Sequence, residues 1–153
     1  MTNAYRELLL NPEFQRAVPT EIRNFRAGEV IIEEGTVSSE LYVLLEGKAD
    51  VYAVIDLIDK PGQQIGISRI AEGEVAGELA LFDQEPRTAT VVAVTDCKVA
   101  AMDGRILTEY MDRNPERGYW ILKEMFSQIV RRMRQTTLRS NTITAIYLND
   151  NAD

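Results

Sequence analysis

The sequence predicts a mainly β fold with flanking helices, an antiparallel β-roll or jelly roll with an N-terminal helix and two C-terminal helices. Between about residues 25 and 102, short apolar runs rich in β-branched and aromatic residues alternate with glycine-containing turns. Several short strands at roughly even spacing are typical of a β-sandwich or barrel. Before residue 25 the composition is helical, and after Met102 apolar residues recur with a helical period.

The N-terminal helix is expected from Ala4 to Leu10, because Asn11-Pro12 ends or kinks a helix. A short helical turn is expected from Phe14 to Val18. The apolar runs that follow predict strands, with a tight turn at Pro61-Gly62. These strands are expected at residues 30–32, 41–45, 49–57, 65–70, 88–94 and 98–102.

Two helices are expected after the last strand. Asp103 is a suitable N-cap for the first, and Asn114 can close it. Pro115 suits the first turn of the second, which we expect to run to about Arg139. The apolar residues of this second helix form a narrow stripe like a coiled-coil seam, namely Leu122, Phe126, Ile129 and Met133. The basic run 131–134 is expected to be a solvated helix end.

The chain of 153 residues, 45% of them hydrophobic, is long enough to bury one core. We expect a single domain over residues 1–140 and a C-terminal tail over residues 141–153, with no DNA-binding domain. The net charge of −7 argues against non-specific nucleic-acid binding, which needs many cations to neutralise phosphates. We therefore expect no nucleic-acid partner.

The sequence contains no histidine. This excludes the usual general base, the Ser-His and Cys-His nucleophile pairs, and histidine-ligated metals. We expect neither an enzyme nor a metal site. A single cysteine, Cys97, favours a reducing compartment. Because no apolar run reaches about 18 residues and no signal peptide is apparent, we expect a cytoplasmic protein without a membrane partner.

One segment, residues 77–89, carries residue types that suit a ribose phosphate. Gly77 lets the backbone leave a strand in a conformation that other residues resist, and residues 78–81 can form one helical turn whose N–H groups favour anions. Arg87 supplies a fork of donors for phosphate, and the Glu78 carboxylate can accept from hydroxyls. Glu78 and Arg87 could alternatively pair with each other across the loop.

This segment resembles the phosphate-binding cassette of cyclic nucleotide-binding domains, which occur in cyclic-AMP-dependent kinase regulatory subunits, cyclic-nucleotide-gated channels and catabolite-activator-type regulators. The family pattern is Gly-Glu-Leu-Ala-Leu, a short spacer and then Pro-Arg-small-Ala, and every position is filled here. The similarity covers about residues 20–138. It includes residues 28–35, 41–47, 72–74 and 114–116.

The resemblance implies roles for individual residues. The carboxylate of Glu78 would hold the ribose 2′-hydroxyl, and Arg87 would pair with an exocyclic phosphate oxygen. Backbone N–H groups would complete the phosphate cradle, and the hydroxyl of Thr88 is compatible with either base. The expected ligand-binding residues are Gly77, Glu78, Leu79, Ala80, Arg87, Thr88 and Ala89. No motif identifies the residue that caps the base, and the candidates are Thr136, Thr137, Arg139 and Tyr147.

The function that follows is a stand-alone receptor for cyclic AMP or cyclic GMP, which needs no other cofactor and signals to an unidentified effector by moving its C-terminal helix. Because related bacterial regulators pair through this helix, the resemblance also implies a homodimer through Leu122, Phe126, Ile129 and Met133. The alternative is an interaction domain with the same fold, or a receptor for another phosphate ligand such as a cyclic dinucleotide.

Overall fold

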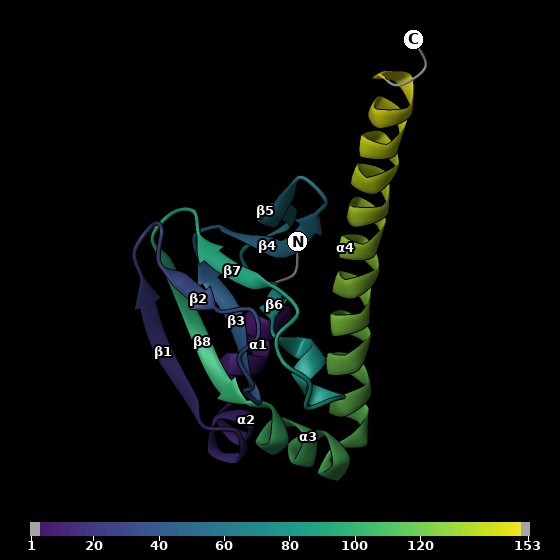
Figure 1. Ribbon diagram of the computed structural model, residues 1–153. Helices are drawn as coiled ribbons and strands as arrows, with labels where there is room; N and C mark the ends of the chain where they lie inside the picture. Colours follow the sequence, from purple (N-terminus) through teal and green to yellow (C-terminus); the bar gives the residue numbers. More distant parts are fainter. Residues whose placement is uncertain (1–3, 151–153) are drawn as a thin grey trace.

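Two four-stranded sheets form the body of the protein, and every strand pairing is antiparallel (Figure 1). The computed structural model describes residues 4–150, without the side chains of residues 57, 139, 140, 142, 143, 147 and 150. One sheet has the order β1-β8-β3-β6 and the other the order β2-β7-β4-β5. The strands are β1 (Thr20–Phe25), β2 (Val30–Ile32), β3 (Glu40–Glu46), β4 (Ala49–Leu57), β5 (Lys60–Ile70), β6 (Val75–Ala76), β7 (Thr90–Ala93) and β8 (Cys97–Asp103).

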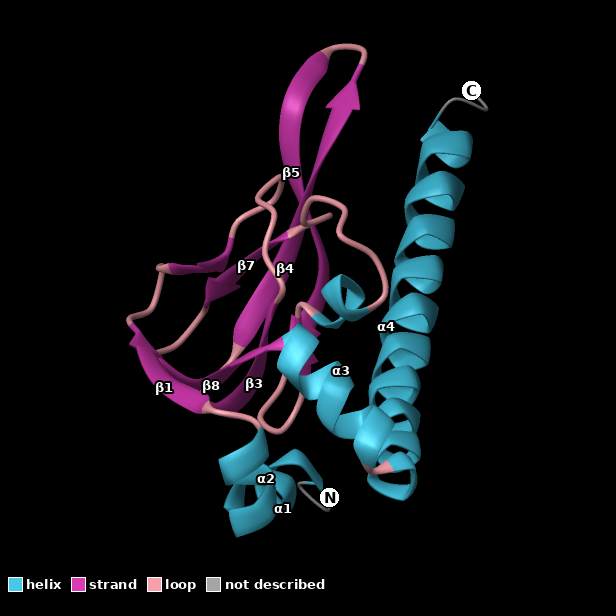
Figure 2. Cartoon of the chain, turned by 90° about the horizontal axis from the view of Figure 1, so that it is seen from below, coloured by secondary structure: helices cyan, strands magenta, loops and turns pink. Residues whose placement is uncertain are grey.

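Helices pack on the outer face of the β1-β8-β3-β6 sheet (Figure 2). They are α1 (Ala4–Leu10), α2 (Pro12–Ala17), α3 (Gly104–Arg113) and α4 (Pro115–Asp150), and a 3₁₀ turn, η1 (Glu78–Leu81), follows β6. Strand β3 shows how both faces of this sheet are buried. Its residues Leu41 and Val43 pack among the helices, whereas Tyr42 and Leu44 face the second sheet. The expected β-roll with flanking helices is confirmed.

Local signals correctly predicted the end of α1 and the starts of α3 and α4, whereas α2 spans Pro12–Ala17 and not the expected Phe14 to Val18. The side chain of Asn11 caps α2 by accepting from the backbone N–H groups of Glu13 and Phe14, and α1 ends just before it. The side chain of Asp103 likewise caps α3 by accepting from the N–H of Arg105. Pro115 is the first residue of α4, where a missing N–H costs nothing.

Three β-strand features differ from the expectation, one of them being the two-residue strand β6, which was not predicted. Strand β1 was not predicted, because it is an edge strand whose residues are exposed or half-buried and so carries no apolar run. The β4–β5 turn lies at Ile58–Asp59, not at Pro61–Gly62. Gly62 instead lies within β5 with a positive φ, and its N–H binds the carboxylate of Asp56 near a break in the register.

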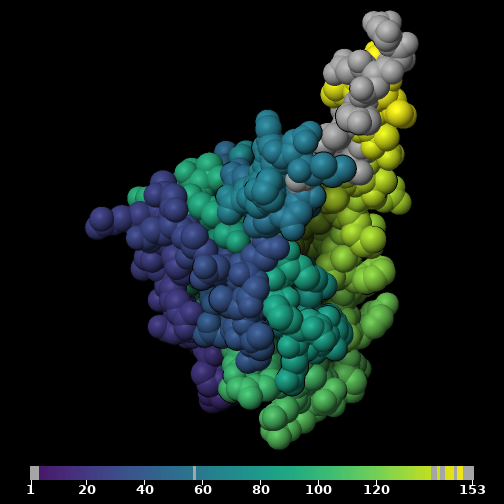
Figure 3. All heavy atoms as spheres, in the orientation of Figure 1, coloured from purple at the N-terminus to yellow at the C-terminus, as the bar shows by residue number. Residues whose placement is uncertain are grey.

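Helix α4 continues to Asp150, beyond the expected end at about Arg139, so that residues 141–150 of the expected tail are helical. No glycine or proline after Gly118 interrupts it. Its 36 residues span about 54 Å, and Figure 3 shows its yellow end projecting past the sheets. Across residues 4–150, no helix is both long enough and apolar enough to cross a bilayer.

The face of α4 that packs on the body is not the stripe assigned to the homodimer, and that assignment stays a prediction. Ile121, Met125 and Gln128 contact the body, whereas Phe126 and Met133 are exposed. Both sets share the same spacing, so periodicity alone cannot say which one faces the core.

Candidate functional site

Gly77 begins the site, between β6 and η1. Its φ is +84°, in the left-handed region that glycine adopts without strain. A Cβ at this position would lie 2.8 Å from Nη1 of Arg87 and 3.1 Å from the backbone oxygen of Glu40. Glycine is therefore required here both by the backbone conformation and by the close approach of Arg87.

The guanidinium of Arg87 is held by backbone oxygens. Its Nη1 donates to the carbonyl of Gly77 at 3.0 Å, and its Nη2 donates to the carbonyl of Glu40. The backbone of Arg87 pairs with the loop before β3, donating to Thr36 O and accepting from Gly35 N, each at 2.8 Å. Only 9% of Arg87 is exposed, so these contacts fix a cation in a largely buried position.

Glu78 is 5% exposed and pairs with a residue of α4. Its Oε1 lies 3.3 Å from Nη1 of Arg132. Arg132 also donates from Nη2 to the carbonyl of Val75 at 2.7 Å, while its Nε is buried without a hydrogen-bond partner. Among the described residues Glu78 forms an ion pair with Arg132 and not with Arg87, so the alternative pairing across the loop is absent.

Further contacts hold α4 against the free edge of β6. The side-chain oxygen of Gln128 accepts from the N–H of Val75 at 2.9 Å, and Arg131 pairs with Glu74. Because Arg132 binds the carbonyl of the same Val75, two side chains of α4 satisfy both backbone groups of one edge residue. We call the set Gln128, Arg131 and Arg132 the α4 latch.

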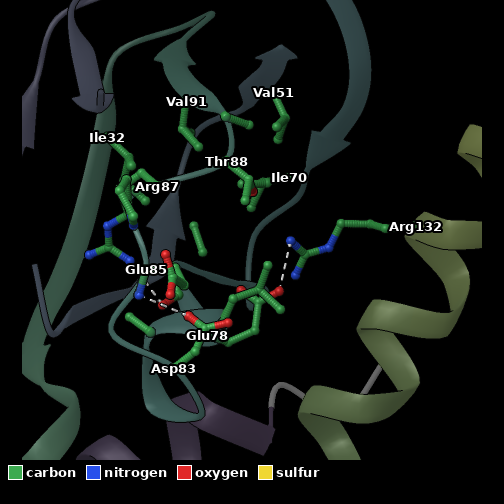
Figure 4. A pocket seen from close by; sticks show the side chains of 16 residues that line it. Ile32, Val51, Ile70, Glu78, Asp83, Glu85, Arg87, Thr88, Val91 and Arg132 are labelled. Atoms are coloured by element: carbon green, nitrogen blue, oxygen red, sulfur yellow. Dashed lines mark hydrogen bonds and ion pairs between the residues drawn. The ribbon is translucent and has the colours of Figure 1, made fainter. Parts of the chain in front are cut away.

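A cavity of about 130 Å³ lies between η1, the following loop and the second sheet. Figure 4 shows Arg132 reaching toward it from α4, opposite Arg87. One side is apolar, formed by Ile32, Val51, Ile70 and Val91. All seven predicted ligand-binding residues line this cavity: Gly77, Glu78, Leu79, Ala80, Arg87, Thr88 and Ala89.

The sequence did not identify the apolar wall residues of the cavity, nor the lining residue that comes from α4, Arg132. It was assigned to a solvated helix end, and its partner Glu78 is far away in the chain, so no local signal marked it. Of the base-capping candidates, Thr136 and Thr137 are exposed one turn beyond Arg132, and the hydroxyl of Thr136 donates to the Arg132 carbonyl. The side chains of Arg139 and Tyr147 lie outside the described part.

The described residues offer few side chains for metal binding or nucleophilic chemistry. Within the described residues no three His, Cys, Asp or Glu side chains gather as metal ligands. The Cys97 thiol is buried behind the β3–β4 turn, and its one S–H lies within hydrogen-bond distance of the backbone carbonyls of Lys48 and Thr95. Burial raises the pKa of this thiol, which disfavours the reactive thiolate.

Comparison with known proteins agrees with this geometry. The family described as "Cyclic nucleotide-binding domain" matches residues 22–114. The chain is 31% identical over 133 residues to a cAMP-dependent protein kinase regulatory subunit from Mycosarcoma maydis, covering 87% of this chain and 23% of that protein. The chain thus spans about a quarter of the length of this curated relative.

Solved structures share the fold. The c-di-GMP-responsive regulator CLP of Xanthomonas campestris superposes with a TM-score of 0.76 at 19% identity, covering 93% of this chain and 63% of that one. A structure described as cAMP-bound PfPKA-R gives a TM-score of 0.57 at 28% identity, covering 70% and 40%. Since the family match extends over more than half of the sequence, the chain belongs to the cyclic nucleotide-binding domain family.

Proposed function

We propose that this protein is a receptor for cyclic AMP or cyclic GMP, without catalytic activity of its own, that acts in the cytoplasm. The observation that carries the proposal is a single cavity lined by a buried guanidinium, Arg87, a buried carboxylate, Glu78, and an apolar wall. Two of the relatives are named as a cAMP-dependent kinase regulatory subunit and a cAMP-bound protein, which supports the same ligand class, whereas CLP is named as responsive to c-di-GMP.

Each part of the ligand has a chemical counterpart in the cavity. Two of the five N–H groups of Arg87 donate to backbone carbonyls, and the guanidinium keeps its full charge for a cyclic phosphate. Glu78 accepts from the ribose 2′-hydroxyl. The flat face of the base packs on the apolar wall that includes Val51 and Val91. The exposed hydroxyl of Thr88 is compatible with adenine and with guanine.

Ligand binding would move α4, because the ribose and Arg132 compete for Glu78. Arg132 lines this cavity of about 130 Å³, so its withdrawal from Glu78 would widen the space open to a nucleotide. A ligand shifts such an equilibrium only through its different affinities for the two helix positions. The helix position in which the α4 latch is released would bind the ligand more tightly, because Glu78 is then available to the ribose.

The exposed face of α4 would bind a second copy of the chain. It presents an apolar stripe spaced by four, three and four residues, which is the pattern of a two-stranded coiled coil. In proteins most of the stability of a helix comes from packing of its apolar face. The residues of this stripe are Leu122, Phe126, Ile129 and Met133, of which Ile129 is half-buried and the others exposed.

Isothermal titration calorimetry with cyclic AMP, cyclic GMP, 5′-AMP and a cyclic dinucleotide tests the ligand. We expect binding of a cyclic mononucleotide and a Tm increase of roughly 5–11 °C at a hundred times its Kd, which corresponds to about 2.7 kcal/mol. Binding of the cyclic dinucleotide alone, or of none of the four, would reject the proposal.

The arginine variants test the site. We expect Arg87→Ala to weaken binding by about 2–5 kcal/mol, or roughly thirty- to several-thousand-fold. Arg87→Lys keeps the charge but loses the forked arrangement of N–H donors, and its affinity should lie between those of Arg87→Ala and the wild type. The matched control is Arg69→Ala, since Arg69 pairs with Asp50 and does not line the cavity. Equal affinities of Arg87→Ala and Arg69→Ala would show that Arg87 does not bind the ligand.

A further inference from the structure

A second charged network lies directly behind Arg87. Arg23, on β1, makes two hydrogen bonds to the carboxylate of Glu40, with Nη1–Oε2 at 3.0 Å and Nη2–Oε1 at 2.8 Å. The hydroxyl of Tyr42 donates to the same carboxylate at 2.8 Å. The guanidinium of Arg23 also lies over the Tyr42 ring, 6.0 Å from its centroid. The Glu40 carboxylate is thus held from two strands.

Glu40 connects this network to the cassette. The backbone carbonyl of Glu40 accepts from Nη2 of Arg87, while its side chain is bound to Arg23. One glutamate therefore lies between two guanidinium groups. Hydrogen bonds from Arg23 are the first cause that lowers the pKa of the Glu40 carboxyl, and the charge of Arg87 also acts on it.

An unpaired carboxylate at this position would compete for Arg87. Glutamate has three rotatable side-chain bonds, and a bidentate carboxylate is a favoured partner of arginine. If Glu40 paired with Arg87, it would offer the same charge and geometry as a phosphate and would oppose an anionic ligand. The bonds from Arg23 and Tyr42 direct the carboxylate elsewhere.

We propose that Arg23 is a positioning residue for anion binding, which keeps the Glu40 carboxylate away from Arg87 and so leaves Arg87 available to the phosphate. This inference rests on the proposed function in assigning the phosphate to Arg87. It gives the exposed edge strand β1 a role in ligand affinity, although none of its residues lines the cavity.

The test is a set of four variants titrated with cyclic AMP and cyclic GMP. Arg23→Met keeps the apolar stem and leaves the Glu40 carboxylate with only the hydrogen bond from Tyr42, and we expect affinity to fall about 10- to 100-fold. Glu40→Gln alone should stay within about threefold of wild type. The double variant Arg23→Met/Glu40→Gln should regain affinity to within about threefold, because the competing charge is gone. Glu21→Gln removes the other carboxylate bound by Arg23 and serves as the matched control, with unchanged affinity.

The rescue separates positioning from simple structural support. If Arg23 only stabilised the fold, the double variant would bind as weakly as Arg23→Met or more weakly, and that result would overturn the inference. So would unchanged affinity in Arg23→Met.

A crystal structure of Arg23→Met without nucleotide gives an answer that does not depend on the ligand. We expect the Glu40 carboxylate within ion-pair distance of Arg87, whereas a Glu40 side chain turned to solvent would contradict the inference. The proposed function fails separately, if the wild type binds neither cyclic mononucleotide.

Discussion

Breaking the contact between Arg132 and Glu78 should measurably loosen α4. Arg132→Met removes the charge but keeps most of the apolar stem, leaving a carboxylate that is 5% exposed without its cation. Loss of one partner from a buried ion pair costs about 3–5 kcal/mol. Because 17% of the Arg132 side chain remains exposed to water, we expect about 2–4 kcal/mol, or roughly 5–15 °C in Tm.

Glu78→Gln should cost less, about 1–2 kcal/mol, because the guanidinium keeps its 2.7 Å bond to the Val75 carbonyl. In the double variant Arg132→Met/Glu78→Gln, no unpaired carboxylate remains. Its cost should therefore fall below the sum of the single costs by about 1–3 kcal/mol.

Urea denaturation followed by circular dichroism measures these free energies, without nucleotide and at one fixed protein concentration. The matched control is Arg134→Met, which removes an exposed arginine from the same helix and should change stability by less than about 0.5 kcal/mol. The destabilisation of Arg132→Met plus that of Glu78→Gln is compared with that of the double variant. Agreement to within about 0.3 kcal/mol would refute the reasoning, since the two side chains would then not be coupled.

The remaining predictions concern single residues. Gly77→Ala should lower stability by more than about 1 kcal/mol and weaken nucleotide binding, because a Cβ would meet the Arg87 guanidinium at a left-handed backbone position; calorimetry and urea denaturation showing wild-type values would contradict this. Phe126→Glu should convert a dimer to a monomer in sedimentation experiments, whereas Phe82→Glu, at an equally exposed phenylalanine away from α4, should not; a wild-type monomer would exclude the dimer. Glu40 has a lowered pKa, so its stabilising contribution is present above the ordinary value of 4.5 and is lost as pH falls through the lower folded value. The stability difference between wild type and Glu40→Gln should therefore shrink between about pH 6 and pH 3, and a constant difference would argue against the Arg23–Glu40 pairing. The Cys97 thiol should react with an aromatic disulfide reagent at least about tenfold faster in urea than in the native protein at about pH 8; equal rates would show that it is accessible.

The cassette could be predicted from sequence because its parts are local. Gly77, Glu78 and Arg87 lie within one short segment, and both the backbone turn and the donor geometry follow from these residue types. The outer edge of the fold could not be predicted in this way. Strand β1 is held by pairing with β8 rather than by an apolar run, so its strand character depends on a partner far along the chain.

Helix α4 shows a second limit of sequence reasoning. Two faces with the same helical spacing compete for the core, and docking against β6 buries the one that contains Gln128 and Arg132. In the sequence, a partly buried arginine such as Arg132 looks like a solvated one. Only its contacts with Val75 and Glu78 reveal it as part of the cavity.

A crystal structure of the wild type grown with its tighter-binding cyclic mononucleotide is the most direct measurement. We expect the phosphate on the guanidinium of Arg87, the ribose 2′-hydroxyl on Glu78, and Arg132 withdrawn from that carboxylate. An empty cavity, with Arg132 still 3.3 Å from Glu78 at saturating nucleotide, would contradict the account.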